Sequence, residues 1–164
     1  MSVEIREATG EDWPAMWAFM RGIIRAGETF SWDTDTDEAT ARRRWMNAPP
    51  GRTFVAVAGA GTVLGTAEMG PNHGGPAAHV ASAGFMVDPR HAGQGVGRRL
   101  GEHVLAQARA DGYRAMQFNA VVECNTPAVR LWRALGFEVL ATIPDGFHHP
   151  VEGDVGLLIM YRRL

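Results

Sequence analysis

The sequence predicts a mixed α/β fold in a single domain that spans residues 1–164. Three successive strand-like runs between residues 53 and 87 predict antiparallel pairing of neighbours. Between residues 80 and 140, strands alternate with amphipathic helices, which predicts one parallel pair of strands. The expected order is β-α-α-β-β-β-α-β-α-β-β. We find no repeat, linker or low-complexity segment in it.

The first third of the chain is expected to form one strand and two helices. Residues 3–6 alternate between apolar and polar side chains, which is typical of a strand. Thr9 and Asp12 form a Thr-x-x-Asp capping pattern, and an apolar stripe at helical spacing follows it until a glycine ends the helix. The second helix is expected to be capped by Thr34 or Thr36.

The remaining elements follow the same patterns. We expect strands at residues 53–58, 63–69, 78–87, 115–121, 137–141 and 155–161. One helix begins near Val96 and stops at Gly112, and another carries its apolar residues at spacings of three and four. Residues 144–153 are expected to form a loop, either lining a pocket or as a plain surface turn. Cys124 is expected to be a buried thiol.

A glycine-rich segment lies between a predicted strand and the start of a predicted helix. It reads Gly93-Gln94-Gly95-Val96-Gly97, directly after Asp88-Pro89. Glycines allow backbone N–H groups to point at a ligand, and the new helix adds its own free N–H groups and dipole. The chain contains no lysine, so this is not a Walker loop. The segment therefore predicts a site for a pyrophosphate or a similar anion.

The same segment resembles the coenzyme A pyrophosphate loop of the GNAT superfamily of N-acetyltransferases. A second motif follows in the expected order: Asn125-Thr126-Pro127-Ala128-Val129-Arg130-Leu131-Trp132, then Leu135-Gly136-Phe137. It is similar to the family's Asn-x-x-Ala-x-x-Leu-Tyr…Gly-Phe segment. The resemblance implies the GNAT fold, in which two parallel central strands splay apart and acetyl-CoA lies between them.

The resemblance also implies which residues bind acetyl-CoA, the expected cosubstrate. Backbone N–H groups before the loop would meet the thioester carbonyl, and the loop would hold the phosphates. The expected cofactor-binding residues are Phe85, Met86, Val87, Gly93, Gln94, Gly95, Val96, Gly97, Arg98, Asn125, Ala128 and Trp132. Trp132 stands where the family often has a tyrosine that protonates the thiolate, and an indole does not serve as that acid. It packs either against the pantetheine arm or in the core.

The catalytic candidates are two carboxylates and one amide. Glu68 and Glu28 are the candidate bases, with an ordinary surface or hydrogen-bonded carboxylate as the alternative for each. Asn119 lies in an apolar strand, where a buried amide needs partners. It is either catalytic and substrate-binding or part of a structural network. Asn125 is a candidate helix cap as well as a cofactor contact.

Several segments resemble one GNAT branch that acetylates azetidine-2-carboxylate and proline-like amines. They are Asn119 with Asn125, the segment Gly27-Glu28-Thr29-Phe30, and Ala83-Gly84-Phe85. The loop at residues 28–30 is also similar to phosphinothricin-type acetyltransferases. This implies a small amino acid or amine as acceptor. The expected substrate-binding residues are Thr29, Phe30, Ser82, Asn119 and His149.

Composition limits the other classes of function. A net charge of −2 does not favour binding to nucleic acid or to a membrane surface. One cysteine and the absence of a signal-like segment favour a cytoplasmic protein, and no metal site is expected. The resemblance implies a homodimer. The rival functions are a protein or peptide N-acetyltransferase and a non-catalytic module that binds or senses acyl-CoA.

Overall fold

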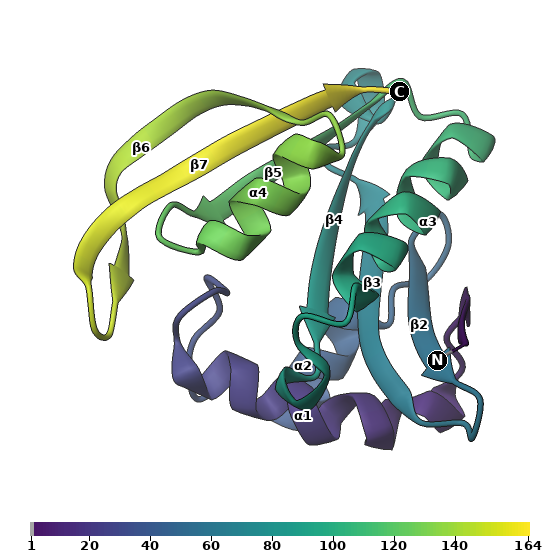
Figure 1. The fold of residues 1–164 in the computed structure, drawn as a ribbon. Helices are drawn as coiled ribbons and strands as arrows, with labels where there is room; N and C mark the ends of the chain where they lie inside the picture. Colours follow the sequence, from purple (N-terminus) through teal and green to yellow (C-terminus); the bar gives the residue numbers. More distant parts are fainter. Residues whose placement is uncertain (1) are drawn as a thin grey trace.

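The computed structural model describes residues 2–164 and contains a seven-stranded mixed sheet in the order β1-β2-β3-β4-β5-β7-β6 (Figure 1). The strands are β1 (Val3–Glu7), β2 (Arg52–Ala58), β3 (Val63–Pro71), β4 (Val80–Val87), β5 (Ala115–Val122), β6 (Glu138–His149) and β7 (Gly153–Arg163). The helices are α1 (Trp13–Ala26), α2 (Glu38–Trp45), α3 (Val96–Ala110) and α4 (Thr126–Ala134). The predicted fold class and element order are confirmed.

The two parallel strands at the centre of the sheet separate soon after they begin. β4 and β5 pair only through Val80 with Ala115 and Ala81 with Met116. All other neighbouring strands are antiparallel. The predicted splay is therefore present. Beyond Ala81 the edge of β4 that faces β5 has no strand partner among the described residues.

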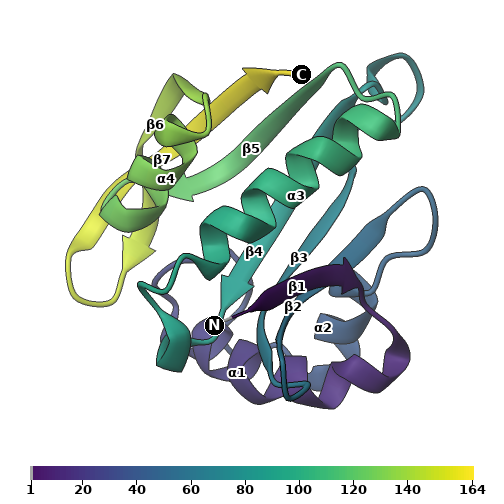
Figure 2. The same cartoon turned by 45° about the vertical axis from the view of Figure 1, so that its right-hand side comes forward.

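The helices cover the two faces of the sheet in pairs (Figure 2). α3 and α4 pack on one face, where they form a core with apolar residues of β2–β5 and β7. α1 and α2 pack on the other face, with Trp13, Met20 and Trp45 fully buried. α3 and α4 also pack closely, because a Cβ at Gly101 would lie 3.2 Å from the Trp132 side chain of α4 and 2.7 Å from that of Leu135, directly after α4.

The predicted helix ends are partly confirmed. The Asp12 carboxylate accepts the backbone N–H of Thr9 at 2.7 Å, and a glycine, Gly27, ends α1 with φ of +64°. The expected cap of the second helix is wrong. α2 begins at Glu38, because the Asp37 carboxylate accepts the N–H of Thr40 at 2.7 Å.

Two further expectations on the C-terminal half are wrong. Residues 144–149 continue β6 instead of forming a loop, because β7 supplies pairing partners as far as His149. The register shifts between Ile143 and Phe147, which accommodates the proline and glycine that suggested a loop. Cys124 is exposed, since it lies in the turn between β5 and α4.

The close contact between α3 and α4 generates a stability prediction. Replacing a helical glycine with alanine favours the helix by about 1 kcal/mol. At Gly22 in α1 a new Cβ meets no atom within 4 Å, so Gly22→Ala should raise the free energy of unfolding by about that amount. At Gly101 the overlap with Leu135 and Trp132 should outweigh this gain, so Gly101→Ala should lower it by about 1–3 kcal/mol. Urea unfolding of both variants measures the difference, and equal changes would contradict the packing of α3 on α4.

Candidate active site

The glycine-rich loop connects β4 to α3 and is built from backbone geometry. Gly93 and Gly95 have φ of +75° and +78°, the left-handed region that favours glycine. Gly95 is the N-cap residue of α3, so no side chain caps the first turn. The backbone N–H groups of Val96, Gly97 and Arg98 precede that of Arg99, which is the first to donate within the helix, to the Gly95 carbonyl at 3.1 Å, so these three point out of the helix end. This geometry suits an anion.

Asp88 anchors the start of this loop. Its side chain is buried, and it accepts the backbone N–H of Arg90 at 3.0 Å and the Arg90 guanidinium at 2.7 Å. The hydrogen bonds from Arg90 hold the pKa of the Asp88 carboxyl below its usual range. An ionised Asp88 therefore fixes the turn where β4 ends and the loop begins.

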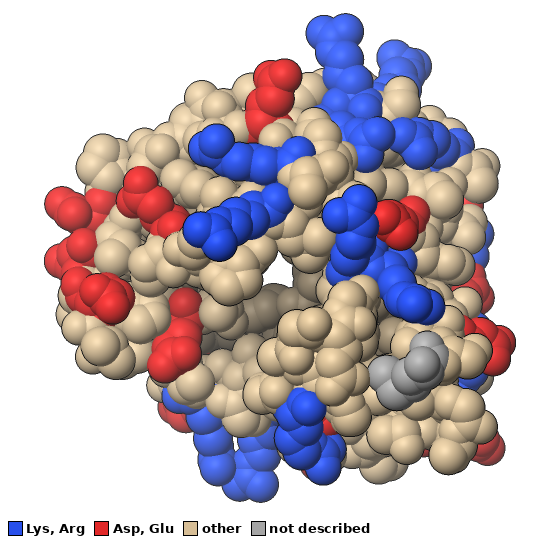
Figure 3. Space-filling model, viewed as in Figure 1, with Lys and Arg blue, Asp and Glu red and all other residues tan. Residues whose placement is uncertain are grey.

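An opening lies between the two halves of the sheet. Figure 3 shows the surface hollowed near its centre, with arginine side chains on both sides of the hollow, over α3 and α4. α3 carries Arg98 and Arg99, and α4 carries Arg130 and Arg133. The hollow corresponds to the place where β4 and β5 have separated.

Aromatic side chains pack together beside this opening. Trp132 of α4 is 7% exposed, and its ring centroid lies 4.6 Å from that of Phe85 and 4.8 Å from that of Phe118. Phe118 also stacks on Phe137 at 4.3 Å. The contacts of Trp132 are those of a core residue, which was one of its two expected roles. Ala128, one turn earlier in α4, packs against the same core.

The opposite face of the sheet carries a polar pocket of about 400 Å³. Side chains alternate along a strand, so Glu68, Gly70 and Asn72 share one face at the end of β3. Ser82 and Gly84 of β4 occupy the same face, since Glu68 pairs with Gly84 and Gly70 with Ser82. The residues that line the pocket are Asn47, Ala48, Pro50, Gly51, Glu68, Gly70, Pro71, Asn72, Ser82 and Asn119. Three predicted site residues therefore come together here: Glu68, Ser82 and Asn119.

Glu68 is the titratable group of this pocket. Burial raises the pKa of its carboxyl to about 7, although hydrogen bonds from the Asn47 side chain and the Gly84 backbone lower it. Asn47 Nδ2 donates to Glu68 Oε2 at 3.0 Å. Gly84 allows this approach, because a Cβ there would lie 3.0 Å from Glu68 Oε1. The carboxyl is thus balanced between its two protonation states near neutral pH.

Asn119 is exposed and lies on a bulge of β5, so the expectation of a buried amide is wrong. The register with β7 shifts between Phe118 and Val121, which frees Asn119 from the ladder. Its amide forms two hydrogen bonds with the amide of Asn72 and accepts one from Gln117. Asn119 therefore belongs to a hydrogen-bonded network, which was one of its two expected roles, and it also lines the pocket; its catalytic and substrate-binding role stays a prediction.

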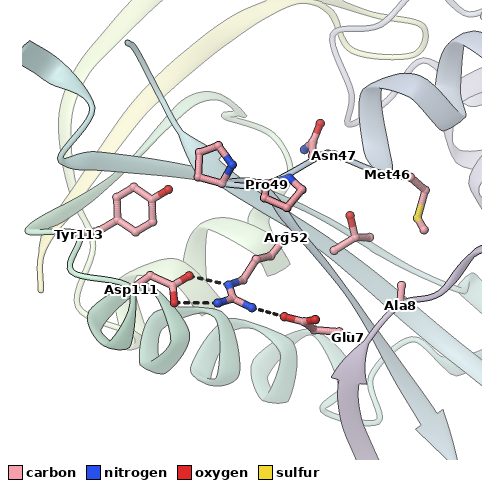
Figure 4. Close-up of a pocket in the computed structure, with 11 residues that line it drawn as sticks. Glu7, Ala8, Met46, Asn47, Pro49, Arg52, Asp111 and Tyr113 are labelled. Carbon is pink, nitrogen blue, oxygen red and sulfur yellow. Dashed lines mark hydrogen bonds and ion pairs between the residues drawn. The ribbon is translucent and has the colours of Figure 1, made fainter. Parts of the chain in front are cut away.

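A larger pocket, of about 550 Å³, adjoins the polar pocket and shares Asn47, Pro50 and Gly51 with it (Figure 4). Its charged groups are paired with one another. The Arg52 guanidinium binds Asp111 through Nε at 2.6 Å and also forms an ion pair with Glu7. The pocket lies near the C-terminal end of α3, far along that helix from the glycine-rich loop. The polar pocket at Glu68 is therefore the better candidate for an acceptor site.

The other predicted residues do not line the polar pocket. Glu28 is exposed in the loop after α1. Thr29 precedes Phe30, whose ring packs against Trp45 with centroids 5.9 Å apart. Trp45 in turn lies against Gly84, so Phe30 reaches the site only through Trp45. His149 accepts the N–H groups of residues 151 and 152 through Nδ1, which closes the β6–β7 turn.

Asn125 occupies the N-cap position of α4, but its side chain makes no capping hydrogen bond. The predicted position is confirmed and the predicted capping contact is wrong. Its backbone carbonyl still accepts the N–H of Val129 at 3.1 Å. The Asn125 side chain remains available at the start of the helix.

Sequence reasoning missed three polar residues of the site: Asn47, Asn72 and Gln117. Strand alternation was a usable signal for two of them, since Asn72 is four residues from Glu68 and Gln117 is two from Asn119. Asn47 had no such signal, because it follows the end of α2 and reaches Glu68 only in the folded chain.

Within residues 2–164 we find no cluster of His, Cys, Asp and Glu side chains that would hold a metal ion. None of the helices in these residues is long and apolar enough to cross a membrane.

Comparison with known proteins identifies the family. Residues 16–137 match the model of the acetyltransferase (GNAT) family. The chain therefore belongs to the acetyltransferase (GNAT) family. It is similar to a solved GCN5-related N-acetyltransferase from Kribbella flavida, with 51% identity and a TM-score of 0.96 over 99% of this chain and 98% of that one.

Two further relatives are more distant. N-acetyltransferase aca1 of Schizosaccharomyces pombe is 34% identical over 84 residues, which are 51% of this chain and only 40% of that protein. A phosphinothricin acetyltransferase (Pat) from Sinorhizobium meliloti, solved in complex with AcCoA, shares the fold. Its TM-score is 0.89 at 22% identity, over all of this chain and 89% of that one.

The environment of Glu68 generates a prediction. Asn47→Leu keeps the bulk beside the carboxyl and removes the donor that stabilises its charged form. The pKa of Glu68 should rise above 7, by roughly one pH unit. A carboxyl ¹³C titration by NMR measures it. An unchanged or lower pKa would show that Asn47 does not stabilise the carboxylate.

Proposed function

We propose that this protein transfers an acetyl group from acetyl-CoA to the amine of a small molecule, by direct attack in a ternary complex. The observation that carries the proposal is the arrangement of three features along β4. The anion-binding loop follows its end, its free edge faces the opening, and Glu68 lies opposite its middle. The alternative of a module that only binds acyl-CoA leaves the perturbed Glu68 unexplained.

The glycine-rich loop supports acetyl-CoA as cosubstrate. Free N–H groups at Val96, Gly97 and Arg98, with the positive end of the α3 dipole, suit the pyrophosphate of the coenzyme. Gly93, Gln94 and Gly95 bring the backbone close without a Cβ at the two glycines. The fold relative from S. meliloti was solved with AcCoA bound, which agrees with this assignment.

The chemistry then divides between Glu68 and the free edge of β4. Acetyl-CoA supplies the acetyl group as a thioester; as the C–N bond forms, the C–S bond breaks, and coenzyme A leaves as a thiolate that takes up the proton lost by the acetylated nitrogen. Glu68, ionised above about pH 7, removes a proton from the acceptor so that a neutral amine attacks. Backbone N–H groups within Phe85–Val87 donate to the thioester oxygen as negative charge develops there. Ser82 and Asn119 orient the acceptor.

The size of the pocket favours a small acceptor. About 400 Å³ suits an amino acid or a comparable amine. Asn47, Ala48, Pro50 and Gly51, after the end of α2, line one side of it. The sequence resembles acetyltransferases that act on azetidine-2-carboxylate and on phosphinothricin. Proline-like amines and small amino acids are therefore the first acceptors to test. Turnover of peptides but of no free amine would overturn this part of the proposal.

The first test concerns the coenzyme loop. Gly95→Val places a β-branched residue at φ of +78°, which distorts the loop. The KM for acetyl-CoA should rise at least about tenfold. Gly112→Val is the matched control, because Gly112 has φ of +88° and equally open surroundings but lies beyond the far end of α3. It should lower stability and leave this KM unchanged. Equal KM values for Gly95→Val and the parent would refute the loop assignment.

The second test concerns the base. For the parent, kcat/KM should rise with pH through about 7, because the base acts in its ionised form and its pKa is raised. Glu68→Gln should remove this ionisation from the profile and lower kcat roughly 10²–10⁴-fold. Glu28→Gln changes the other candidate carboxyl, which is exposed and outside the pocket. It should alter neither the pH profile nor kcat. If the pH profile followed Glu28 instead, Glu68 would not be the base.

A further inference from the structure

Three side-chain amides form a connected network at the far side of the polar pocket. Asn72 Nδ2 donates to Asn119 Oδ1 at 3.2 Å, and Asn119 Nδ2 donates to Asn72 Oδ1 at 2.6 Å. Gln117 Nε2 donates to the same Asn119 Oδ1 at 2.9 Å. The network joins the end of β3 to β5 across the first residues of β4, where β4 and β5 still pair.

Counting donors and acceptors shows what Asn119 offers to a ligand. A carboxamide has two acceptor sites on oxygen and two N–H donors on nitrogen. Both acceptor sites of Asn119 are filled, one by Asn72 and one by Gln117. One N–H is used by Asn72, so one N–H donor remains free. In this arrangement Asn119 can donate to a ligand but has no acceptor site left for it.

Gln117 differs from the other two amides in its position. Asn72 and Asn119 both line the pocket, and Gln117 does not. Gln117 lies two residues before Asn119 on β5, so the two side chains share a face. Any effect of Gln117 on the acceptor therefore acts through the orientation of Asn119.

We infer that Gln117 and Asn72 are positioning residues, which hold the Asn119 amide so that it presents an N–H donor and selects amines that carry a hydrogen-bond-accepting oxygen. The inference rests on the proposed function, because it places the acceptor in this pocket with its amine at Glu68. The oxygen belongs to a hydroxyl, an amide carbonyl or a carboxylate, and these share the chemistry that an N–H donor recognises. An amine substrate whose second polar group is a protonated ammonium, which only donates hydrogen bonds, finds no partner at the free N–H of Asn119.

Two substitutions of Gln117 separate orientation from packing. Gln117→Leu removes the donor, so the Asn119 amide is free to turn. Gln117→Glu replaces the donor with a group that only accepts, which favours the reversed amide with its N–H toward position 117 and its oxygen toward the pocket. Gln107→Leu is the matched control, since Gln107 is a glutamine on α3 that bonds Asp111 outside the site.

The acceptors for the test differ in one group beside the same ring amine. They are pyrrolidine, prolinol, prolinamide, proline and 2-(aminomethyl)pyrrolidine, each with saturating acetyl-CoA. For the parent, kcat/KM should be highest for one of the three oxygen-bearing amines. Gln117→Leu should lower that preference over pyrrolidine roughly 3- to 10-fold, mainly through KM. Gln117→Glu should shift preference toward the aminomethyl compound, and Gln107→Leu should match the parent.

An equal loss on all five amines in Gln117→Leu would overturn the inference and indicate a merely structural role. If the parent binds acetyl-CoA but acetylates none of the amines, the proposed acceptor class fails instead. The network itself is tested without turnover, by NMR of the Asn119 side-chain NH₂ protons. Their exchange with solvent should be slower in the parent than in Gln117→Leu, and equal rates would refute the positioning role.

Discussion

The separation of β4 from β5 after two residue pairs is the constraint on which the rest of this structure depends. Three aromatic rings, from Phe85, Phe118 and Trp132, pack against one another on the α3–α4 side of the sheet, beside the place where the two strands diverge. The divergence leaves one edge of β4 without a strand partner, and the same strand runs directly into the glycine-rich loop. In the proposed function, the thioester of acetyl-CoA meets the free backbone N–H groups of that edge while the phosphates of the coenzyme meet the start of α3.

The two faces of β3, β4 and β5 have opposite characters, and alternation along the strands produces both. One set of side chains forms the apolar core beneath α3 and α4. The other set includes Glu68, Ser82 and Asn119, which form a polar floor. Glu68 lies beside Gly84, next to Trp45, and its burial raises the pKa of its carboxyl. In the proposed function this matters because a carboxylate with a raised pKa accepts a proton from an ammonium group more readily.

The candidate site was predictable where local pattern carries its chemistry. The loop could be located because glycine spacing and a helix start occur within a few residues, and both depend on backbone geometry alone. Glu68 and Asn119 were recognisable as polar residues in apolar strands. The choice between Glu68 and Glu28 was not predictable, because both are acidic residues in plausible segments. Burial raises the pKa of the first, and the second is exposed.

Hydrophobic periodicity and turn signals were sufficient to predict the order of strands and helices and the mixed sheet, because these signals lie within short stretches of the sequence. The amide network of Asn72, Gln117 and Asn119 depends on pairing between β3 and β4 and on the bulge in β5. The length of β6 likewise depends on its partner β7. Such features join segments that are far apart along the chain, so only the tertiary structure decided them.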